Sequence, residues 1–95
     1  MTTPETQLKS DVKELLAVYS IFNYPLVQGL GAHKGIPDRV AHIKGVVHYL
    51  EFKRPKGTLS AHQEVFKAHC DADGIPYHVI RSLDQAMELV KELLK

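Results

Sequence analysis

Two segments of the chain carry apolar side chains at the spacing of one helical face. In residues 5–19 these side chains recur at intervals of four, three and four positions, at Leu8, Val12, Leu15 and Tyr19. In residues 83–94 a similar helical spacing is followed by Leu83, Met87, Val90 and Leu94. Pro4 suits the first turn of the first helix, and Ser82 suits the N-cap of the second. We therefore predict a helix near each end of the chain.

The middle of the chain is dominated by β-branched and aromatic residues, as in β-strands. The sequence RVAHIKGVVHYLEFK begins at Arg39 and is interrupted by Lys44-Gly45, a pair typical of a two-residue hairpin turn. Two weaker signals, YPLVQGL and PYHVIR, lie before and after it in the sequence. The pattern predicts four strands, over residues 24–30, 39–43, 46–53 and 76–81.

A third helix is predicted between the last two strands. Ser60 is a good N-cap for the segment AHQEVFKAHCDAD, and Gly74 suits the position after its last turn. The order of elements is then α-β-β-β-α-β-α, with this helix crossing between two neighbouring strands. That order predicts an α/β fold in which a small mixed sheet is flanked by helices, and a single domain over residues 1–95.

Composition limits the classes of protein that remain. The chain of 95 residues has 12 Lys and Arg against 11 Asp and Glu, a net charge of +1. The overall charge therefore gives no indication that the protein binds nucleic acid. It has no apolar run of roughly 20 residues that could cross a membrane, and its polar start is not a signal peptide, so we expect a cytoplasmic protein. A core this small also favours pairing with a second copy of the chain.

Three charged residues fall at one place in the predicted hairpin. Side chains alternate along a strand, so Glu51 and Lys53 project from the same face near the end of their strand. With the turn at Lys44-Gly45, the two strands pair so that Asp38 lies opposite Glu51. Two carboxylates this close repel each other unless a proton or a cation lies between them. Their oxygen atoms suit Mg²⁺ or Mn²⁺, and a lysine beside such an ion could stabilise a phosphodiester transition state.

The motifs around these residues resemble those of a nuclease family. GIPD, a strand and then EFK resemble the PD-(D/E)xK nuclease signature, and EFKRPKGTLSAHQ resembles the VRR-NUC family within it. The closing GIPYHVIRSLDQA is similar to the last strand and helix of that family. The resemblance extends over about residues 29–90 and implies a PD-(D/E)xK restriction-endonuclease-like core.

The resemblance also implies roles for particular residues. Asp38 and Glu51 would bind the metal ion, with the backbone carbonyl of Phe52 as a further ligand. Lys53 would be the catalytic lysine, and Gln63 would face the same site from the following helix.

The family usually carries a glutamate on its first helix, for which Glu5 and Glu14 are the candidates. At about 100° per residue Glu5 falls near the apolar face of that helix, whereas Glu14 falls nearly opposite it. Glu5 also lies three residues before Leu8, which matches the E-x-x-I start of the family. We therefore expect Glu5 to be the additional catalytic and metal-binding acid.

Stand-alone, virus-type members of the VRR-NUC family tend to be homodimers that cut branched DNA. The resemblance therefore implies a Mg²⁺- or Mn²⁺-dependent endonuclease similar to a Holliday-junction resolvase, acting in the host cytoplasm if the protein is virus-encoded. Two alternatives stay open: a less selective flap or nicking nuclease, and a non-catalytic module that binds branched DNA. Candidate contacts to the DNA backbone are Lys34, Arg39, Arg54 and Lys56.

Each site residue also has a purely structural interpretation. Asp38 follows a proline and could be a turn residue. Glu51 and Lys53 could form an exposed ion pair that stabilises the fold by at most about 1 kcal/mol. Gln63 could serve only as the capping-box partner of Ser60.

Overall fold

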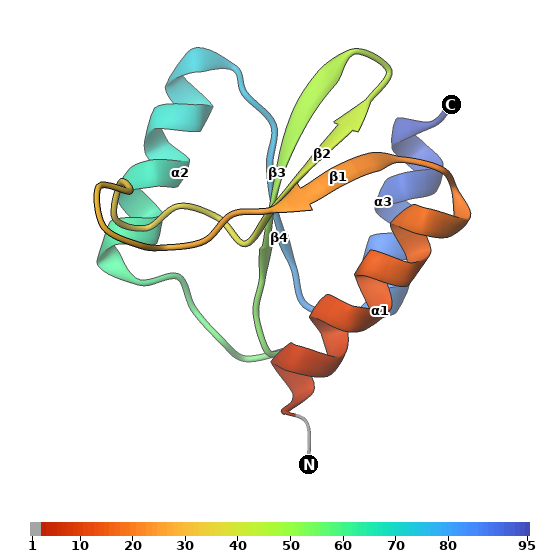
Figure 1. Ribbon diagram of the computed structural model, residues 1–95, viewed down its shortest axis with the longest axis horizontal. Helices are drawn as coiled ribbons and strands as arrows, with labels where there is room; N and C mark the ends of the chain where they lie inside the picture. The colour runs from red at the N-terminus through yellow and green to blue at the C-terminus, as the bar shows by residue number, and fades with distance from the viewer. Residues whose placement is uncertain (1–2) are drawn as a thin grey trace.

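The computed structural model describes residues 3–95 as three helices and a four-stranded sheet (Figure 1). In chain order the elements are α1 (Pro4–Val18), β1 (Phe22–Pro25), β2 (Arg39–Ile43), β3 (Val46–Phe52), α2 (Ala61–Asp73), β4 (Tyr77–Ile80) and α3 (Leu83–Leu93). The predicted fold class and order of elements are confirmed. Within the described residues, no helix is long and apolar enough to cross a membrane.

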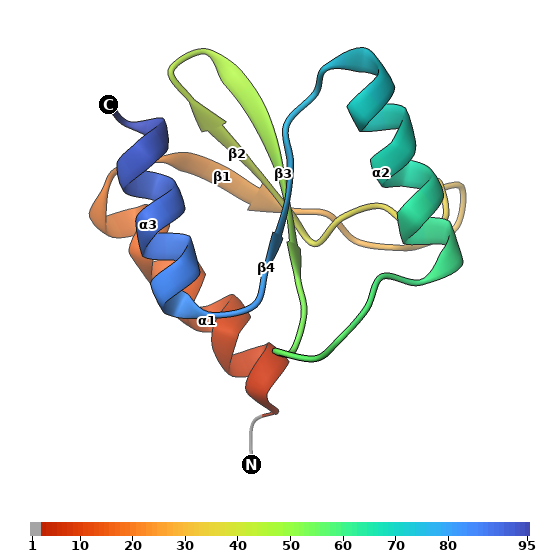
Figure 2. The same cartoon turned by 180° about the vertical axis from the view of Figure 1, so that it is seen from behind.

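The strands lie in the sheet in the order β1-β2-β3-β4. The first three run antiparallel to their neighbours, whereas β4 is parallel to β3. A parallel pair needs a crossover connection, which α2 provides while covering one face of the sheet. Figure 2, seen from behind, shows α1 and α3 packed together on the other face. The sheet therefore separates a two-helix layer from a layer that contains α2.

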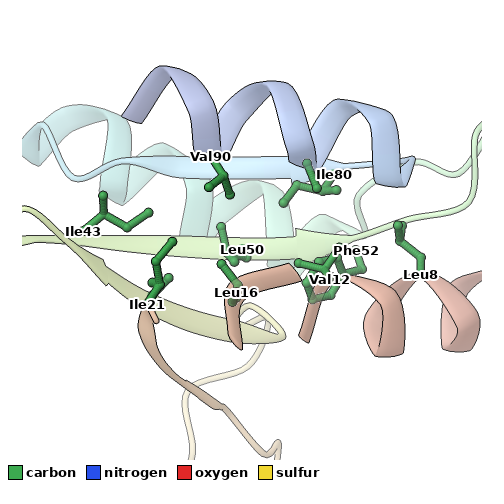
Figure 3. Close-up of a cluster of buried hydrophobic side chains, with 11 residues drawn as sticks. Leu8, Val12, Leu16, Ile21, Ile43, Leu50, Phe52, Ile80 and Val90 are labelled. Carbon is green, nitrogen blue, oxygen red and sulfur yellow. The ribbon is translucent and has the colours of Figure 1, made fainter. Parts of the chain in front are cut away.

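The hydrophobic core lies between the sheet and the α1–α3 layer. Figure 3 shows Leu8, Val12 and Leu16 of α1 pointing towards the sheet, with Val90 of α3 nearby. The sheet contributes its own apolar side chains on this face: Ala41, Ile43, Leu50, Phe52 and Ile80. Burial of one such leucine or phenylalanine contributes roughly 1.5–3 kcal/mol to folding. Because this face of β3 is apolar, the alternate residues Tyr49 and Glu51 face α2.

The β2–β3 hairpin has the predicted turn and register. Lys44 (φ 51°) and Gly45 (φ 79°) both have positive φ values, as a type I′ turn requires. Val46 pairs with Ile43, and Leu50 pairs with Arg39. This register brings the start of β2 beside the end of β3, which is where the predicted acids lie.

Two predictions about boundaries and faces were wrong. The strand predicted at residues 24–30 is instead β1 at Phe22–Pro25. It ends at Pro25 because proline has no backbone N–H to continue the pairing. One further bond follows, from the N–H of Leu26 to the carbonyl of Asp38. The buried stripe of α1 continues through Leu16 rather than Tyr19, which is the C-cap and is exposed. In a helix, positions at i, i+4 and i+8 stay on one face, so Leu16 follows Leu8 and Val12.

The loop between β1 and β2 is held against the first turn of α2. Gly35 has φ +81°, and a Cβ atom at this position would lie 2.3 Å from the backbone oxygen of His62. The ring of His33, in the same loop, contacts the ring of Phe66 with a centroid separation of 6.1 Å. The β1–β2 loop therefore packs directly against α2.

Candidate functional site

Asp38 is fixed to β3 by two hydrogen bonds that flank Glu51. Its backbone N–H donates to the carbonyl of Leu50 at 3.1 Å, and its Oδ2 accepts from the backbone N–H of Phe52 at 2.8 Å. Glu51 lies between these two anchors and is only 2% exposed. The hairpin therefore brings the two predicted acids together, and Asp38 is more than a turn residue.

The contact between the two carboxyl groups shifts the protonation of Glu51. Burial is the largest cause, and the charge of Asp38 and a hydrogen bond shared with Asp38 add to it, raising the pKa of Glu51 to about 8. The positive charges of Lys53 and Lys9 act in the opposite direction. Contact with Asp38 and burial therefore both favour the protonated form of Glu51, and a cation could take the place of that proton.

Gln63 connects the acidic pair to α2. Its Nε2 donates to Oε1 of Glu51 at 3.2 Å, while its Oε1 accepts from the backbone N–H of Ser60 at 2.8 Å. Ser60 returns the bond, since its Oγ accepts from the backbone N–H of Gln63, which completes a capping box. Gln63 therefore both caps α2 and contacts Glu51, so its contacts are not limited to the capping box.

Lys53 lies directly after β3 on the same side as Glu51. Its backbone N–H donates to the carbonyl of Ile80 at 3.0 Å, which fixes the start of the loop. Its ammonium group is close enough to Glu51 to lower the pKa of that carboxyl. A cleft of about 250 Å³ opens beside it, between α1 and the start of α3, and its lining includes Gln7, Asp11, Lys53, Arg54 and Arg81.

Lys9 is a member of the site that the sequence did not single out. Its Nζ lies 3.4 Å from Oδ1 of Asp38 and 3.8 Å from Oε1 of Glu5. Lys9 therefore links the acid expected from α1 to the pair on the sheet, whereas Glu14 lies on the exposed face of that helix. The i, i+4 spacing of Glu5 and Lys9 predicts an ion pair, but the contact with Asp38 depends on how α1 packs.

The donor set of the site is small. Within residues 3–95, no three His, Cys, Asp or Glu side chains form a cluster that could hold a metal ion. The acidic centre consists of Asp38 and Glu51, with Glu5 reached through Lys9. Asp38 and Glu51 are in contact, and Oε2 of Glu51 is a buried oxygen with no hydrogen-bond partner. Two such carboxyl groups fit a hard divalent cation that replaces the proton of Glu51.

The predicted DNA-binding residues lie at different distances from this centre. Arg54 and Lys56 are exposed in the loop after Lys53, and Lys34 is exposed in the loop held against α2. Arg39 instead pairs with Leu50, so its side chain is on the opposite face of the sheet, where its guanidinium donates to Oδ1 of Asn23. Its partial burial there lowers its pKa. The structure does not bring Arg39 to the carboxylates.

The fold is shared with a solved structure described as a VRR_NUC domain. The two chains are 22% identical, the TM-score is 0.83, and the alignment covers 95% of this chain and 97% of the other. No family model and no curated protein sequence matches the chain. At this identity the similarity establishes the fold, and the sequence motifs at Asp38, Glu51 and Lys53 resemble the same family independently. The chain therefore has the fold of a VRR_NUC domain.

Proposed function

We propose that this protein is a Mg²⁺- or Mn²⁺-dependent DNA endonuclease of the VRR-NUC family. The observation that carries the proposal is the contact between Asp38 and Glu51, held beside Lys53 in a fold shared with a VRR_NUC domain. Two carboxyl groups in contact destabilise a fold unless they bind something, so their placement supports a role in binding a cation.

The oxygen atoms that would hold the ion come from the end of the hairpin. Asp38 and Glu51 would bind it, the backbone carbonyl of Phe52 would add a ligand, and Glu5 is a candidate ligand from α1. An ion bound there would lower the pKa of a water molecule and stabilise negative charge on the scissile phosphate. The bond from the N–H of Phe52 to Oδ2 of Asp38 keeps that carboxylate oriented.

The remaining side chains act on the substrate or on Glu51. Lys53 would place its ammonium group against the scissile phosphate and stabilise the charge that develops in the transition state. Gln63 keeps the carboxylate of Glu51 from rotating, through the bond to Oε1. Arg54 and Lys56, exposed in the adjoining loop, would contact backbone phosphates without reading sequence.

We further propose that the substrate is branched DNA and that the enzyme acts as a homodimer. The resemblance of the motifs to stand-alone, virus-type members supports both points. Two sites related by a two-fold axis suit a four-way junction, because each can cut one of two symmetric strands. One copy of the chain also leaves large apolar side chains exposed that a second copy could cover, including Phe22, Val46 and Val47.

A cleavage assay on a labelled four-way junction, with a linear duplex and a flap for comparison, tests the proposal. Wild type is compared with Lys53→Ala and with Lys91→Ala, a matched control on the exposed face of α3. Lys53→Ala should lose cleavage by at least about 10²-fold, as expected for removal of one transition-state contact, and should still bind the junction in EDTA. Lys91→Ala should cut like the wild type.

The results separate the alternatives. Paired nicks with Mg²⁺ or Mn²⁺ that vanish in EDTA and in Lys53→Ala would support a junction endonuclease, and sedimentation would give the oligomeric state. Cleavage of flaps or nicked duplexes at similar rates would favour the less selective nuclease. Binding without cleavage by any variant would refute the enzymatic proposal and leave a module that binds branched DNA.

A further inference from the structure

Two buried oxygen atoms near the site have no hydrogen-bond partner. Within residues 3–95, these unpaired buried side-chain atoms are Oε2 of Glu51 and the hydroxyl oxygen of Tyr77. Buried polar groups are nearly always hydrogen-bonded, so an unpaired one calls for a functional explanation. Here one atom is an acceptor and the other can donate, which makes them complementary.

The register of β3 and β4 puts these two side chains on the same face of the sheet. Tyr77 pairs with Tyr49, and Glu51 pairs with Val79, so Tyr77 is diagonal to Glu51 on the neighbouring strand. The ring of Phe66, on α2, contacts both Tyr49 and Tyr77, with centroid separations of 5.3 and 6.2 Å. The same helix that carries Gln63 therefore packs over Tyr77.

The Tyr77 hydroxyl also lies within the electrostatic field of the acidic pair. Burial is the first cause that raises the pKa of Tyr77, and the negative charges of Glu51 and then Asp38 come next. A tyrosine hydroxyl carries its hydrogen at neutral pH and is therefore available as a neutral donor. A neutral donor can orient a carboxylate without competing with a cation for its charge.

We infer that Tyr77 is a positioning residue of the proposed site: its hydroxyl donates to Oε2 of Glu51 through one bridging water and fixes the carboxylate for binding a divalent cation. Gln63 holds the other oxygen of Glu51 at 3.2 Å, so the carboxylate would be held from both sides. Each oxygen retains a lone pair for the ion. The inference rests on the proposed function, since it concerns the same carboxylate.

Calorimetric titration of the full chain with Mn²⁺ tests the inference on Tyr77→Phe, which removes only the hydroxyl. Tyr49→Phe is the matched control, because Tyr49 contacts the same Phe66 ring from the adjacent strand. We expect Tyr77→Phe to bind Mn²⁺ roughly tenfold more weakly than wild type, the effect of losing one hydrogen bond to a charged group. Thermal unfolding in EDTA checks that the variant folds, and it should remain a single cooperative transition. Tyr49→Phe should bind like wild type.

The outcomes separate this inference from the proposed function. If wild type binds Mn²⁺ and Glu51→Gln does not, but Tyr77→Phe binds like wild type, the role of Tyr77 is refuted and the metal site stands. If wild type and Glu51→Gln bind Mn²⁺ equally weakly, both proposals fail.

A second measurement covers the case in which Tyr77→Phe fails to fold. The chain has four tyrosines and no tryptophan, so the ¹³Cζ signal of Tyr77 can be assigned by elimination with Phe variants of the other three. Mg²⁺ should shift the Tyr77 signal more than those of Tyr19 and Tyr24, which are exposed. A Tyr77 signal that does not move on saturation with Mg²⁺ would overturn the inference.

Discussion

The charged form of Glu51 is disfavoured in the fold unless an ion is bound beside it. It is almost fully buried, it contacts Asp38, and its pKa is raised to about 8. In the unfolded chain the same group has its ordinary pKa near 4.5. Between these two values the folded protein holds a proton that the unfolded chain has lost, so the free energy of unfolding falls as the pH rises.

We expect Glu51→Gln to stabilise the ion-free protein at alkaline pH. The penalty from Glu51 is absent below about pH 4.5 and complete above about pH 8. Gln cannot ionise, so the variant should unfold at higher urea concentration than wild type at pH 8.5 in EDTA, and the difference should shrink towards pH 4.5. Urea titrations at several pH values measure this directly.

Glu14→Gln is the control for this experiment, because Glu14 is exposed on α1. It should track wild type at every pH. A Glu51→Gln variant less stable than wild type at pH 8.5 would mean that Glu51 is ionised and well paired in the fold, and that burial beside Asp38 does not destabilise its charged form.

At the level of elements, the site depends on how the β1–β2 loop meets α2. Gly35→Ala should destabilise the protein by about 2 kcal/mol or more, because its Cβ would collide with the backbone of His62 in addition to the strain of a positive φ. Since His62 precedes Gln63, the shift should also weaken binding of Mn²⁺. Chemical denaturation and calorimetry measure the two effects.

Gly31→Ala isolates the backbone contribution. Gly31 has a similar φ of +84°, but a Cβ there meets nothing within 4 Å. It should lose only about 1 kcal/mol and leave ion binding intact. Equal losses in the two variants would show that the contact with His62 is unimportant.

The elements that could be predicted from the sequence are those defined by local chemistry. The Lys44-Gly45 turn, the Ser60 and Ser82 caps and the Gly74 end of α2 each depend on residues a few positions apart, and each appears as predicted. The register followed from the turn, so the proximity of Asp38 to the end of β3 was predictable as well.

The rest of the site could not be predicted in this way because it depends on packing between distant elements. Lys9 reaches Asp38 across the contact of α1 with the sheet. Tyr77 comes near Glu51 only through the parallel register of β3 and β4. Arg39 appeared close to the acids in sequence, yet strand alternation puts its side chain on the other face.

Considered as a whole, the molecule has titrating groups on both faces of its sheet. On the face opposite Glu51, Nδ1 of His48 lies 2.9 Å from Nε2 of His78, and the two rings are stacked with an interplanar angle of 18°. Burial lowers the pKa of both, and the neighbouring His48 helps to lower that of His78 to about 4. Both histidines are therefore neutral in the fold at neutral pH.

We expect His78→Gln to reduce the loss of stability in acid. A histidine whose pKa is lowered in the fold stabilises the protein above its unfolded pKa, near 6.5, and this stability is lost as the pH falls towards 4. For the partly exposed His78 the loss is on the order of 1–2 kcal/mol. The free energy of unfolding should therefore fall less steeply between pH 6.5 and pH 4 in His78→Gln than in its parent.

The experiment is clearest in a Glu51→Gln background, because Glu51 titrates in the opposite direction over the same pH range. The two residues lie on opposite faces of the sheet, so their effects should add. His69→Gln, at an exposed position of α2, is the control. Identical acid slopes for the His78 variant and its parent would show that this ring pair does not govern acid stability.

The two-residue turn between β2 and β3 also limits how the gene can change length. The face that Glu51 occupies depends on whether the number of residues between the turn and Glu51 is odd or even. With regular strand pairing kept, one added codon in this stretch would turn Glu51 and Lys53 towards the hydrophobic core and turn Leu50 and Phe52 towards α2. Two added codons would restore every side chain to its proper side. A single added residue is therefore compatible with the buried acid and the core only if a bulge or a longer turn absorbs it, which ties the length of this hairpin to both faces of the sheet at once.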